Sequence, residues 1–484
     1  MNLKFMSMAA IAAMTLCTAC SEDDNTPNPE PPVADAYSSE LFLAAANNNA
    51  INYNFSNTFT NKFVGTIDGG ADMTKVDNFF KAAAYRGAVP ANNDWTAGWI
   101  RTSGNGDETS ANAEEILQGE LTANKTLLKN KVYALSGEYI VKTGATLTIE
   151  EGVKIVAMTD DESVDYILVQ QGAKIEAVGT KENPIIMTSD KKESGAWGGL
   201  HICGKAHTNA EGGTGKSEIG DAAYGGSADN DNSGTLKYIR LENTGYALDS
   251  EHEANGISFY GVGNGTTVEY VQAYNGSDDG FEFFGGSVDV KHMVVTNCSD
   301  DSYDWTEGWN GKAQFLVAYQ EGESSLGYAC DCLMECDNNG TNNAATPVAH
   351  PTIANATLIG NGGDAQGVRL RAGTQVELYN TIITGKGKPL TVETNETENA
   401  LKDGTSKLEY VAISGELSSK QGIYTNVDFA QATGNLTNQE FSWTGKYVGT
   451  LDGGKDLSAD SFFTKTDYKG AVKSDDDWTS GWTL

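Results

Sequence analysis

A row of acidic side chains followed by two arginines is the feature of this chain that could most directly do chemistry. Glu282, Asp304 and Glu335 recur at the same place in successive segments, and Arg369 and Arg371 follow in the same alignment. Stacked carboxylates repel each other and raise each other's pKa unless a cation lies between them. Two carboxyl groups about 5–10 Å apart can also hydrolyse a glycosidic bond. The row is therefore a candidate for ligand binding or catalysis, and the alternative is a solvated ladder that the arginines neutralise.

The segments that carry this row repeat with a period of roughly 22 residues. The stretch "VEYVQAYNGSDDGFEFFGG" begins at Val268, and "VKHMVVTNCSDDSYDWTEG" begins at Val290. Each segment alternates apolar residues and is broken by Gly, Asn or Asp, as short strands are. Such strands cannot bury a face alone and must stack on their neighbours. The repeat predicts an all-β chain folded as a right-handed parallel β-helix of about a dozen coils over residues 130–440. Asparagines at equivalent turns predict a ladder of bonded amides: Asn243, Asn275 and Asn297.

The alternation also predicts which side chains of this row face inward. Successive residues of a strand point to opposite faces. Phe281, Phe283, Tyr303 and Trp305 then share the apolar face, so Trp305 is expected in the core. Trp309 lies after a glycine in a turn and remains a candidate aromatic contact for a ligand.

The stretch "DNDNSG" is similar to the start of a calcium-binding loop. Asp229, Asp231 and Ser233 occupy its first, third and fifth positions, which would supply oxygen ligands for Ca²⁺. Its twelfth position is Arg240, where a bidentate Glu is expected. The alternative is a polar turn that precedes a strand.

Cysteines and histidines give no clear metal motif. Five cysteines follow residue 20, an odd number that allows at most two disulfides, and the histidines have no ligand spacing. We favour core positions or a local disulfide over a metal cluster for Cys203, Cys298, Cys330, Cys332 and Cys336.

A longer duplication flanks the predicted β-helix. Residues 62–99 match residues 446–482, and the two copies end in "DWTAGW" and "DWTSGW". Open β-helices need their bare strand edges covered. We therefore expect an N-terminal cap or small lobe over 37–129 and a C-terminal cap over 441–484 that covers the last coil. Trp95 and Trp99 belong to the first copy. As an alternative to packing within a cap, they are candidates for stacking on a sugar.

The N-terminus has the layout of a secretion signal followed by a lipidated cysteine. Residues 1–19 are the expected signal peptide, "CTAC" is similar to a lipoprotein lipobox, and Cys20 is the expected lipidation site. Residues 20–36 read as a Pro-rich tether. We expect a protein held by lipid on the outer membrane and exposed at the cell surface. The formal net charge of −33 excludes nucleic acid and makes acidic glycans poor ligands unless a cation bridges them.

Several stretches together, among them "WGGLHICGKA", "DNDNSGTLKYIRLEN", "SDDGFEFFGG" and "HPTIANATLIG", resemble a family of surface-exposed Bacteroidetes lipoproteins. The resemblance covers about residues 135–390 and implies a right-handed, pectate-lyase-like β-helix. It suggests a non-enzymatic accessory of a SusC/SusD-type uptake system, with an uptake barrel and its lid lipoprotein as partners and a glycan or peptide as ligand. A β-helix polysaccharide lyase or glycoside hydrolase using the acidic row, or an adhesin, remains the alternative.

Overall fold

The computed structural model describes residues 65–68, 85–89, 109–159, 164–248, 253–363 and 365–484. The chain divides into two compact units, residues 1–95 and 96–484. In the first unit, β1 (Gly65–Asp68) and β2 (Tyr85–Val89) pair as an antiparallel hairpin. Within the described residues, no helix is long and apolar enough to cross a membrane.

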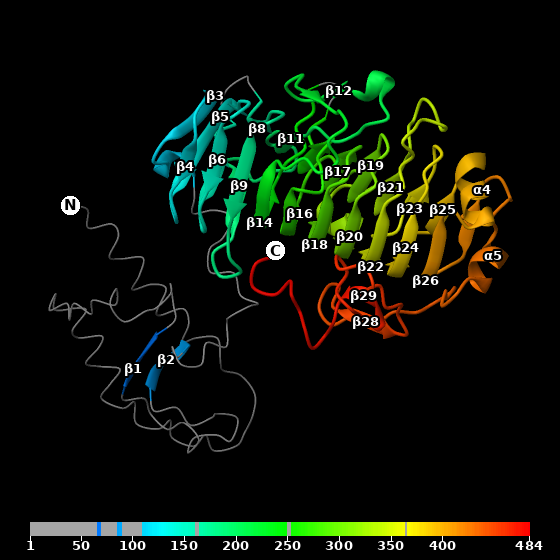
Figure 1. Ribbon diagram of the computed structural model, residues 1–484. Helices are drawn as coiled ribbons and strands as arrows, with labels where there is room; N and C mark the ends of the chain where they lie inside the picture. Colours follow the sequence, from blue (N-terminus) through cyan, green and yellow to red (C-terminus); the bar gives the residue numbers. More distant parts are fainter. Residues whose placement is uncertain (1–64, 69–84, 90–108, 160–163, 249–252, 364) are drawn as a thin grey trace, which may run out of the picture. The chain divides into compact units, whose positions relative to one another are not determined.

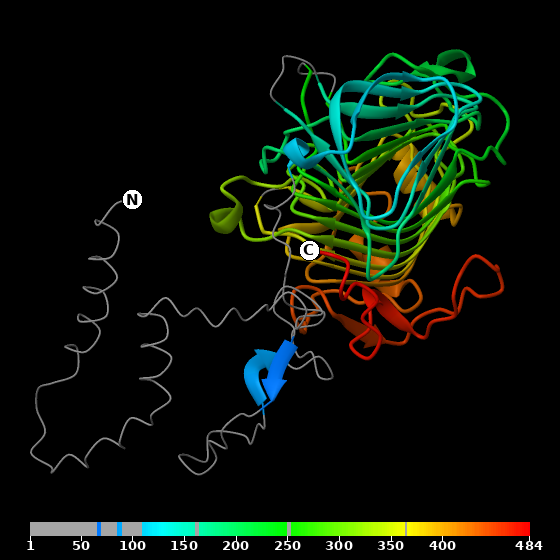
Figure 2. The same cartoon turned by 90° about the vertical axis from the view of Figure 1, so that its left-hand side faces the viewer.

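The second unit is built around a parallel β-helix (Figures 1 and 2). The strands of its coils form one 23-stranded sheet. Three ladders run along it, which we name A, B and C. Ladder A contains eleven strands of the described chain, close to the dozen coils predicted from the repeat. They are β3 (Ile116–Leu121), β5 (Val132–Val141), β8 (Tyr166–Val169), β11 (Leu200–Cys203), β15 (Ile257–Tyr260), β17 (Phe281–Phe284), β19 (Tyr303–Thr306), β21 (Met334–Cys336), β23 (Gln366–Leu370), β25 (Lys388–Val392) and β27 (Leu417–Ser419).

Ladders C and B are formed in most coils by one long strand that bends between them. The bent strands are β14 (Gly234–Glu242), β16 (Thr267–Tyr274), β18 (Asp289–Thr296), β20 (Lys312–Tyr319), β22 (Thr352–Ile359), β24 (Glu377–Thr384) and β26 (Lys407–Ile413). The early coils use separate strands instead: β4 (Lys125–Leu127), β6 (Thr146–Ile149) and β9 (Lys174–Val178) in ladder C, and β7 (Lys154–Ala157) and β10 (Ile185–Ser189) in ladder B. Because β3 and β4 already belong to the sheet, the coils begin before the expected residue 130.

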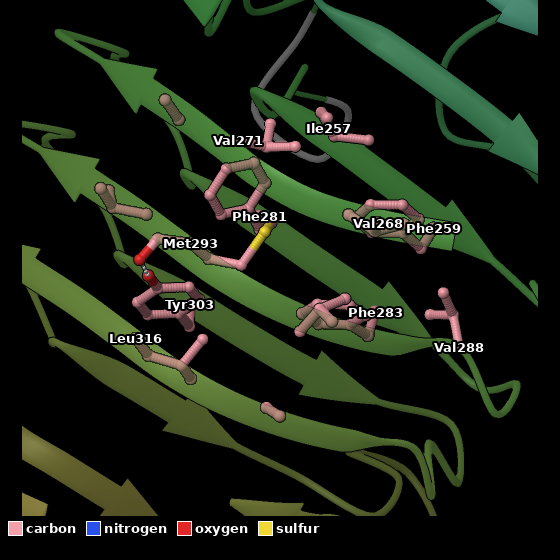
Figure 3. Packing of buried hydrophobic residues seen from close by; sticks show 14 of the residues in the cluster. Ile257, Phe259, Val268, Val271, Phe281, Phe283, Val288, Met293, Tyr303 and Leu316 are labelled. Carbon is pink, nitrogen blue, oxygen red and sulfur yellow. Dashed lines mark hydrogen bonds between the residues drawn. The ribbon is translucent and has the colours of Figure 1, made fainter. Parts of the chain in front are cut away.

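The core lies inside the coils, with the parity predicted from the alternation. Phe259 stacks on Phe283 with 5.1 Å between ring centroids, and Phe281 lies 5.9 Å from Tyr303. Figure 3 shows these side chains on the same inner side of adjacent strands. Trp305 is 2% exposed, which confirms it as a core residue.

An asparagine ladder forms at the turn between ladders B and A. Asn243, Asn275 and Asn297 all have positive φ angles. The Asn275 amide donates to Asn243 Oδ1 at 2.8 Å, and Asn297 Oδ1 accepts from the backbone of Glu321. The predicted ladder is confirmed between Asn243 and Asn275.

The C-terminal segment lies along the side of the β-helix and not over its last coil. Its hairpin, β28 (Gly449–Asp452) and β29 (Tyr468–Val472), contacts the bent strands from β20 to β26 (Figure 1). The physical reason is a column of left-handed residues at the strand bends whose rings stack outside the coils: Tyr238, Tyr270, His292 and Phe315. Trp478 and Trp482 cover this column.

The last coil is instead covered by short helices. In α5 (Asn426–Gln431), Phe429 is buried in the main core. In α4 (Asn395–Asp403), the buried Glu398 accepts bonds from the side chain of Ser419 and from the backbone nitrogens of residues 421, 423 and 424. These elements close the apolar end that the C-terminal segment was expected to close.

Candidate functional site

The row predicted from the sequence exists in the register predicted. Glu282 lies beside Asp304 on the next coil, Asp304 beside Glu335, and Glu335 beside Arg369. All four side chains are on the outer face of ladder A, because their neighbours along each strand point into the core. Adjacent strands of a sheet are about 4.8 Å apart, so the carboxylates are held close together by the backbone.

Two further columns of carboxylates stand beside the row and were not identified from the sequence. They come from the turn that leads into each strand: Asp278 and Asp279 before β17, and Asp300 and Asp301 before β19. Backbone hydrogen bonds stack these turns, since Gly280 N donates to Asp301 O at 2.9 Å. The repeated "SDDG" and "SDDS", three residues ahead of Glu282 and Asp304, was the signal available. We call Asp278, Asp279, Glu282, Asp300, Asp301 and Asp304 the acidic face.

The carboxylates of the acidic face have few hydrogen-bond donors. Glu282 accepts from Asn255 Nδ2 at 2.7 Å, and Asp279 Oδ1 accepts from the backbone of Asp301 at 2.9 Å. Asp301 Oδ1 accepts from Cys332 N at 2.7 Å. Asp304 Oδ1 is buried and has no partner within the described chain. Neither Lys nor Arg forms an ion pair with the acidic face among the described residues.

Arg369 and Arg371 form ion pairs with acids outside the acidic face. Arg369 bonds Glu335 at 2.7 Å and Glu393 at 3.1 Å. Arg371 bonds Asp337 at 2.7 Å and also pairs with Glu335. They therefore neutralise the end of the row, and the middle of the row remains without a basic partner.

This arrangement raises the pKa of the carboxyl groups. Burial, followed by repulsion from Asp300 and Glu253, raises the pKa of Asp278 to about 8. Burial and Asp331 raise the pKa of Asp300 to about 6. The pKa values of Asp279, Asp301, Glu282 and Asp304 are well above the ordinary range, first because of burial and then because of neighbouring carboxylates. Such shifts mark functional sites more often than ordinary surfaces.

Oxygen atoms of the acidic face come close enough to surround a cation. Within the described residues, donor atoms lie within 4.8 Å of one another in four groups, of which one is Asp279, Glu282 and Asp304. The others are Asp279, Asp300 and Asp301; Glu253, Asp278 and Asp300; and Asp301, Cys332 and Glu335. Carboxylate oxygens are the ligands that Ca²⁺ and Mg²⁺ prefer.

Comparison with known families identifies the architecture. Residues 119–483 match the model of a family described as a pectate-lyase like beta helix domain. The chain belongs to this family. No curated protein and no solved structure matches the chain. Membership therefore establishes the fold of this pectate-lyase-like protein, and its chemistry has to be argued from its own side chains.

In this pectate-lyase-like domain, a long loop covers the outer face of ladder A before the acidic face begins. The loop, residues 204–233, contains η4 (Glu211–Gly213), β12 (Gly215–Lys216) and β13 (Ala223–Tyr224). Tyr224 packs against Tyr260 at 5.1 Å, and its hydroxyl donates to Glu307 at 2.7 Å. Beyond this loop, Glu282, Asp300 and Asp304 are partly exposed. The acidic face is thus bounded on one side by an apolar cover and on the other by the arginines.

A cavity of about 600 Å³ lies elsewhere on ladder A. Its lining includes Gln118, Glu138, Tyr166, Ile219 and Leu248, and none of the acidic face. It contains one carboxylate and no basic side chain, so its chemistry is less specific than that of the acidic face.

The candidate calcium turn is held by hydrogen bonds to protein groups. Asp229 Oδ1 bonds His207 Nδ1 at 2.7 Å, and Asp231 Oδ2 accepts from Ser233 Oγ at 3.2 Å. The close donor groups of the described residues do not include Asp229 or Asp231. The structure favours the alternative of a polar turn, and calcium at this turn stays a prediction.

The remaining candidate residues divide into buried residues and residues outside the described chain. Trp309 is 1% exposed, stacks on Phe283 at 4.2 Å and donates to Val288 O. It is a core residue and not a surface contact, because the turn after Gly308 directs the ring into the coil. Cys20, Trp95 and Trp99 lie outside the described residues. The cysteines predicted as core or disulfide residues are free and buried: Cys203, Cys298, Cys330, Cys332 and Cys336.

Proposed function

We propose that this pectate-lyase-like protein is a cell-surface protein that binds a ligand at the acidic face without altering it chemically. One observation carries the proposal: six carboxylates gather beside ladder A, and none of them forms an ion pair with Lys or Arg among the described residues. Like charges held this close destabilise the fold, since they must either repel or take up protons. Folds tolerate such a cost mainly where a ligand relieves it.

The arrangement of the arginines supports binding over catalysis. A lyase that used Arg369 as a helper or base would need its guanidinium free to meet the substrate. Here Arg369 is shared between Glu335 and Glu393, and Arg371 between Glu335 and Asp337. Burial tends to lower the pKa of Arg371, but Asp337 and Glu335 hold it above the ordinary value. Neither arginine is placed to accept a proton.

Polysaccharide cleavage is the second candidate, and one observation favours it. Glu282 and Asp304 lie on adjacent strands, and burial followed by neighbouring carboxylates raises the pKa of both well above the ordinary value. A protonated carboxylic acid beside an ionised one is the pair that glycoside hydrolysis requires. A lyase or hydrolase would then work through these two residues and not through the arginines.

For cellular context, we propose that lipid at Cys20 holds the β-helix at the outer membrane, where it serves a SusC/SusD-type uptake complex. The support is the leader-like N-terminus, the Pro-rich tether and the family resemblance described above. Within such a complex, the acidic face would present a glycan or peptide to the uptake barrel.

Two experiments test this proposal. The full-length lipoprotein is first recovered from outer membranes in mild detergent, and an uptake barrel with its lid is expected in stoichiometric amounts. Recovery of the protein alone would contradict the accessory role. Glycan and peptide arrays are then probed with wild-type protein, Asp304→Asn and the control Asp221→Asn, which changes an exposed acid paired with Lys216. Binding that Asp304→Asn alone weakens supports the acidic face, whereas new reducing or unsaturated ends would establish cleavage.

A further inference from the structure

We propose that Lys386 and Asn361 form an intramolecular amide cross-link, in which the lysine amine displaces ammonia from the asparagine side chain and joins two adjacent coils. The inference goes beyond the proposed function and does not depend on it, because it concerns a covalent modification of the β-helix itself.

Lys386 and Asn361 occupy equivalent places in consecutive coils. Each lies two residues past the end of its bent strand, Asn361 after β22 and Lys386 after β24. Gly360 N donates to Thr384 O at 2.8 Å, so the backbone stacks the two turns. The lysine side chain runs over Gly360, where a Cβ atom would lie only 2.6 Å from the Cγ of Lys386. The glycine therefore leaves room for the lysine stem and holds it beside Asn361.

The amine touches the amide group that it would attack. Lys386 Nζ is 3.0 Å from Asn361 Oδ1 and 2.8 Å from the backbone oxygen of Cys330. Asn361 Nδ2 donates to Glu321 O at 3.1 Å, which fixes the orientation of the amide plane. Groups held this close react far faster than the same groups free in solution, because little entropy remains to be lost before they meet.

The environment of Lys386 favours its neutral, nucleophilic form. The residue is 5% exposed, and both hydrogen bonds that its amine donates in the described chain go to neutral oxygens. An ammonium group has three N–H donors, whereas a neutral amine donates two and keeps a lone pair. Burial lowers the pKa of Lys386, and the nearby Cys330 and Asp331 oppose this effect only in part. A desolvated lysine of this kind can act as a nucleophile.

The reaction balances without an outside reactant. The lone pair of Lys386 Nζ attacks Asn361 Cγ, and the new Nζ–Cγ bond places a negative charge on Oδ1. When the carbonyl re-forms, the Cγ–Nδ2 bond breaks, and Nδ2 leaves as ammonia with a proton that Nζ gives up. Cys330 can relay this proton. Burial raises the pKa of its thiol to about 11, and Lys386 and a hydrogen bond with the Asn361 side chain lower it in part.

The test is peptide mapping by mass spectrometry of the folded, full-length protein after digestion with trypsin. We expect the peptide that contains Asn361 to be joined to one that contains Lys386, with a mass below their sum by one ammonia molecule. Lys386→Arg and Asn361→Ala should both lack the joined peptide. The control Lys446→Arg changes a surface lysine that pairs with Glu321, and it should retain the joined peptide.

Two further variants separate the reaction from simple packing. Asn361→Asp should give a joined peptide of the same mass as the wild type, because loss of water from the new carboxyl group leaves the same amide. Cys330→Ala should slow the joining in newly synthesised protein by about tenfold or more, as loss of a proton relay does. Joining at the wild-type rate in this variant would contradict the relay.

The result for the wild-type chain decides the inference and does not require any variant to fold. Folded wild-type protein that yields only the two separate peptides overturns it. A joined peptide that persists in Lys386→Arg also overturns it, since the link would then run through another residue.

Discussion

Asp304→Asn should stabilise the protein, although it replaces a half-buried residue. The side chain keeps its shape, and Asp304 Oδ1 has no hydrogen-bond partner to lose in the described chain. The carboxylate is disfavoured by burial and then by Glu335, Asp337 and Asp300, and the attraction of Arg371 offsets this in part. Two unit charges about 5 Å apart repel by about 3 kcal/mol at an effective dielectric constant of 20. Partial protonation reduces this cost, so we expect a gain of about 1–3 kcal/mol at pH 8.

The matched control is Glu335→Gln, one coil further in the same row. Glu335 pairs with both arginines, so its neutralisation leaves their charges less well compensated and should cost about 1–3 kcal/mol. The assay is urea unfolding in EDTA at pH 8, repeated at pH 4, where protonation should remove most of the difference for Asp304→Asn. Loss of stability in both variants by similar amounts would refute the argument that the acidic face is electrostatically strained.

Three further predictions concern pH and packing. The melting temperature of the protein should fall as pH rises from about 5 to 8.5, because the folded-state pKa values of Asp300 (about 6) and Asp278 (about 8) exceed those of the unfolded chain. The stabilisation from these two groups is fully present below about pH 4. A melting temperature that rises across this pH range would contradict the prediction. Trp482→Ala should release the C-terminal segment from the side of the coils, at a cost of about 3–5 kcal/mol, because the ring is 1% exposed against Tyr238; limited proteolysis should then cut within 446–484 while the coils stay intact. Glu398→Ala should cost about 2–4 kcal/mol by leaving the backbone donors of residues 421, 423 and 424 unpaired. Hydrogen exchange should become faster at these residues and stay unchanged in β17.

The repeat and its alternation were enough to predict the coils and the row on their outer face. In a parallel sheet, in-register stacking puts equivalent positions side by side, so the alignment of Glu282 with Asp304 already implied their contact. The same parity placed Trp305 in the core. The pattern within each repeat is sufficient to predict the stacking and the inward-facing residues, because each coil contacts mainly its neighbours.

The place of the C-terminal segment and the partners of Arg369 depend on contacts between distant parts of the chain, so the repeat could not predict them. The C-terminal segment was expected over the last coil, but Trp478 packs against His292, which is far away in the sequence. Only the left-handed bend of the strands exposes that ring column, and a bend of this kind is not visible in apolar alternation. Likewise, the alignment of the coils did not reveal that Arg369 forms an ion pair with Glu393, which lies on the following coil.

The acidic face begins and ends at coils where the equivalent positions hold neutral residues or are paired with arginines. Stacking fixes equivalent side chains about 4.8 Å apart, so a run of acids can be relieved only by neutral residues, by bases or by bound cations and protons. Before the acidic face, the equivalent positions hold neutral Asn255 and Ser258. After it, Glu335 meets the arginines. Between these boundaries the carboxylates of the acidic face form no direct ion pair within the described residues, and that interval is where a bound ligand has the most to contribute.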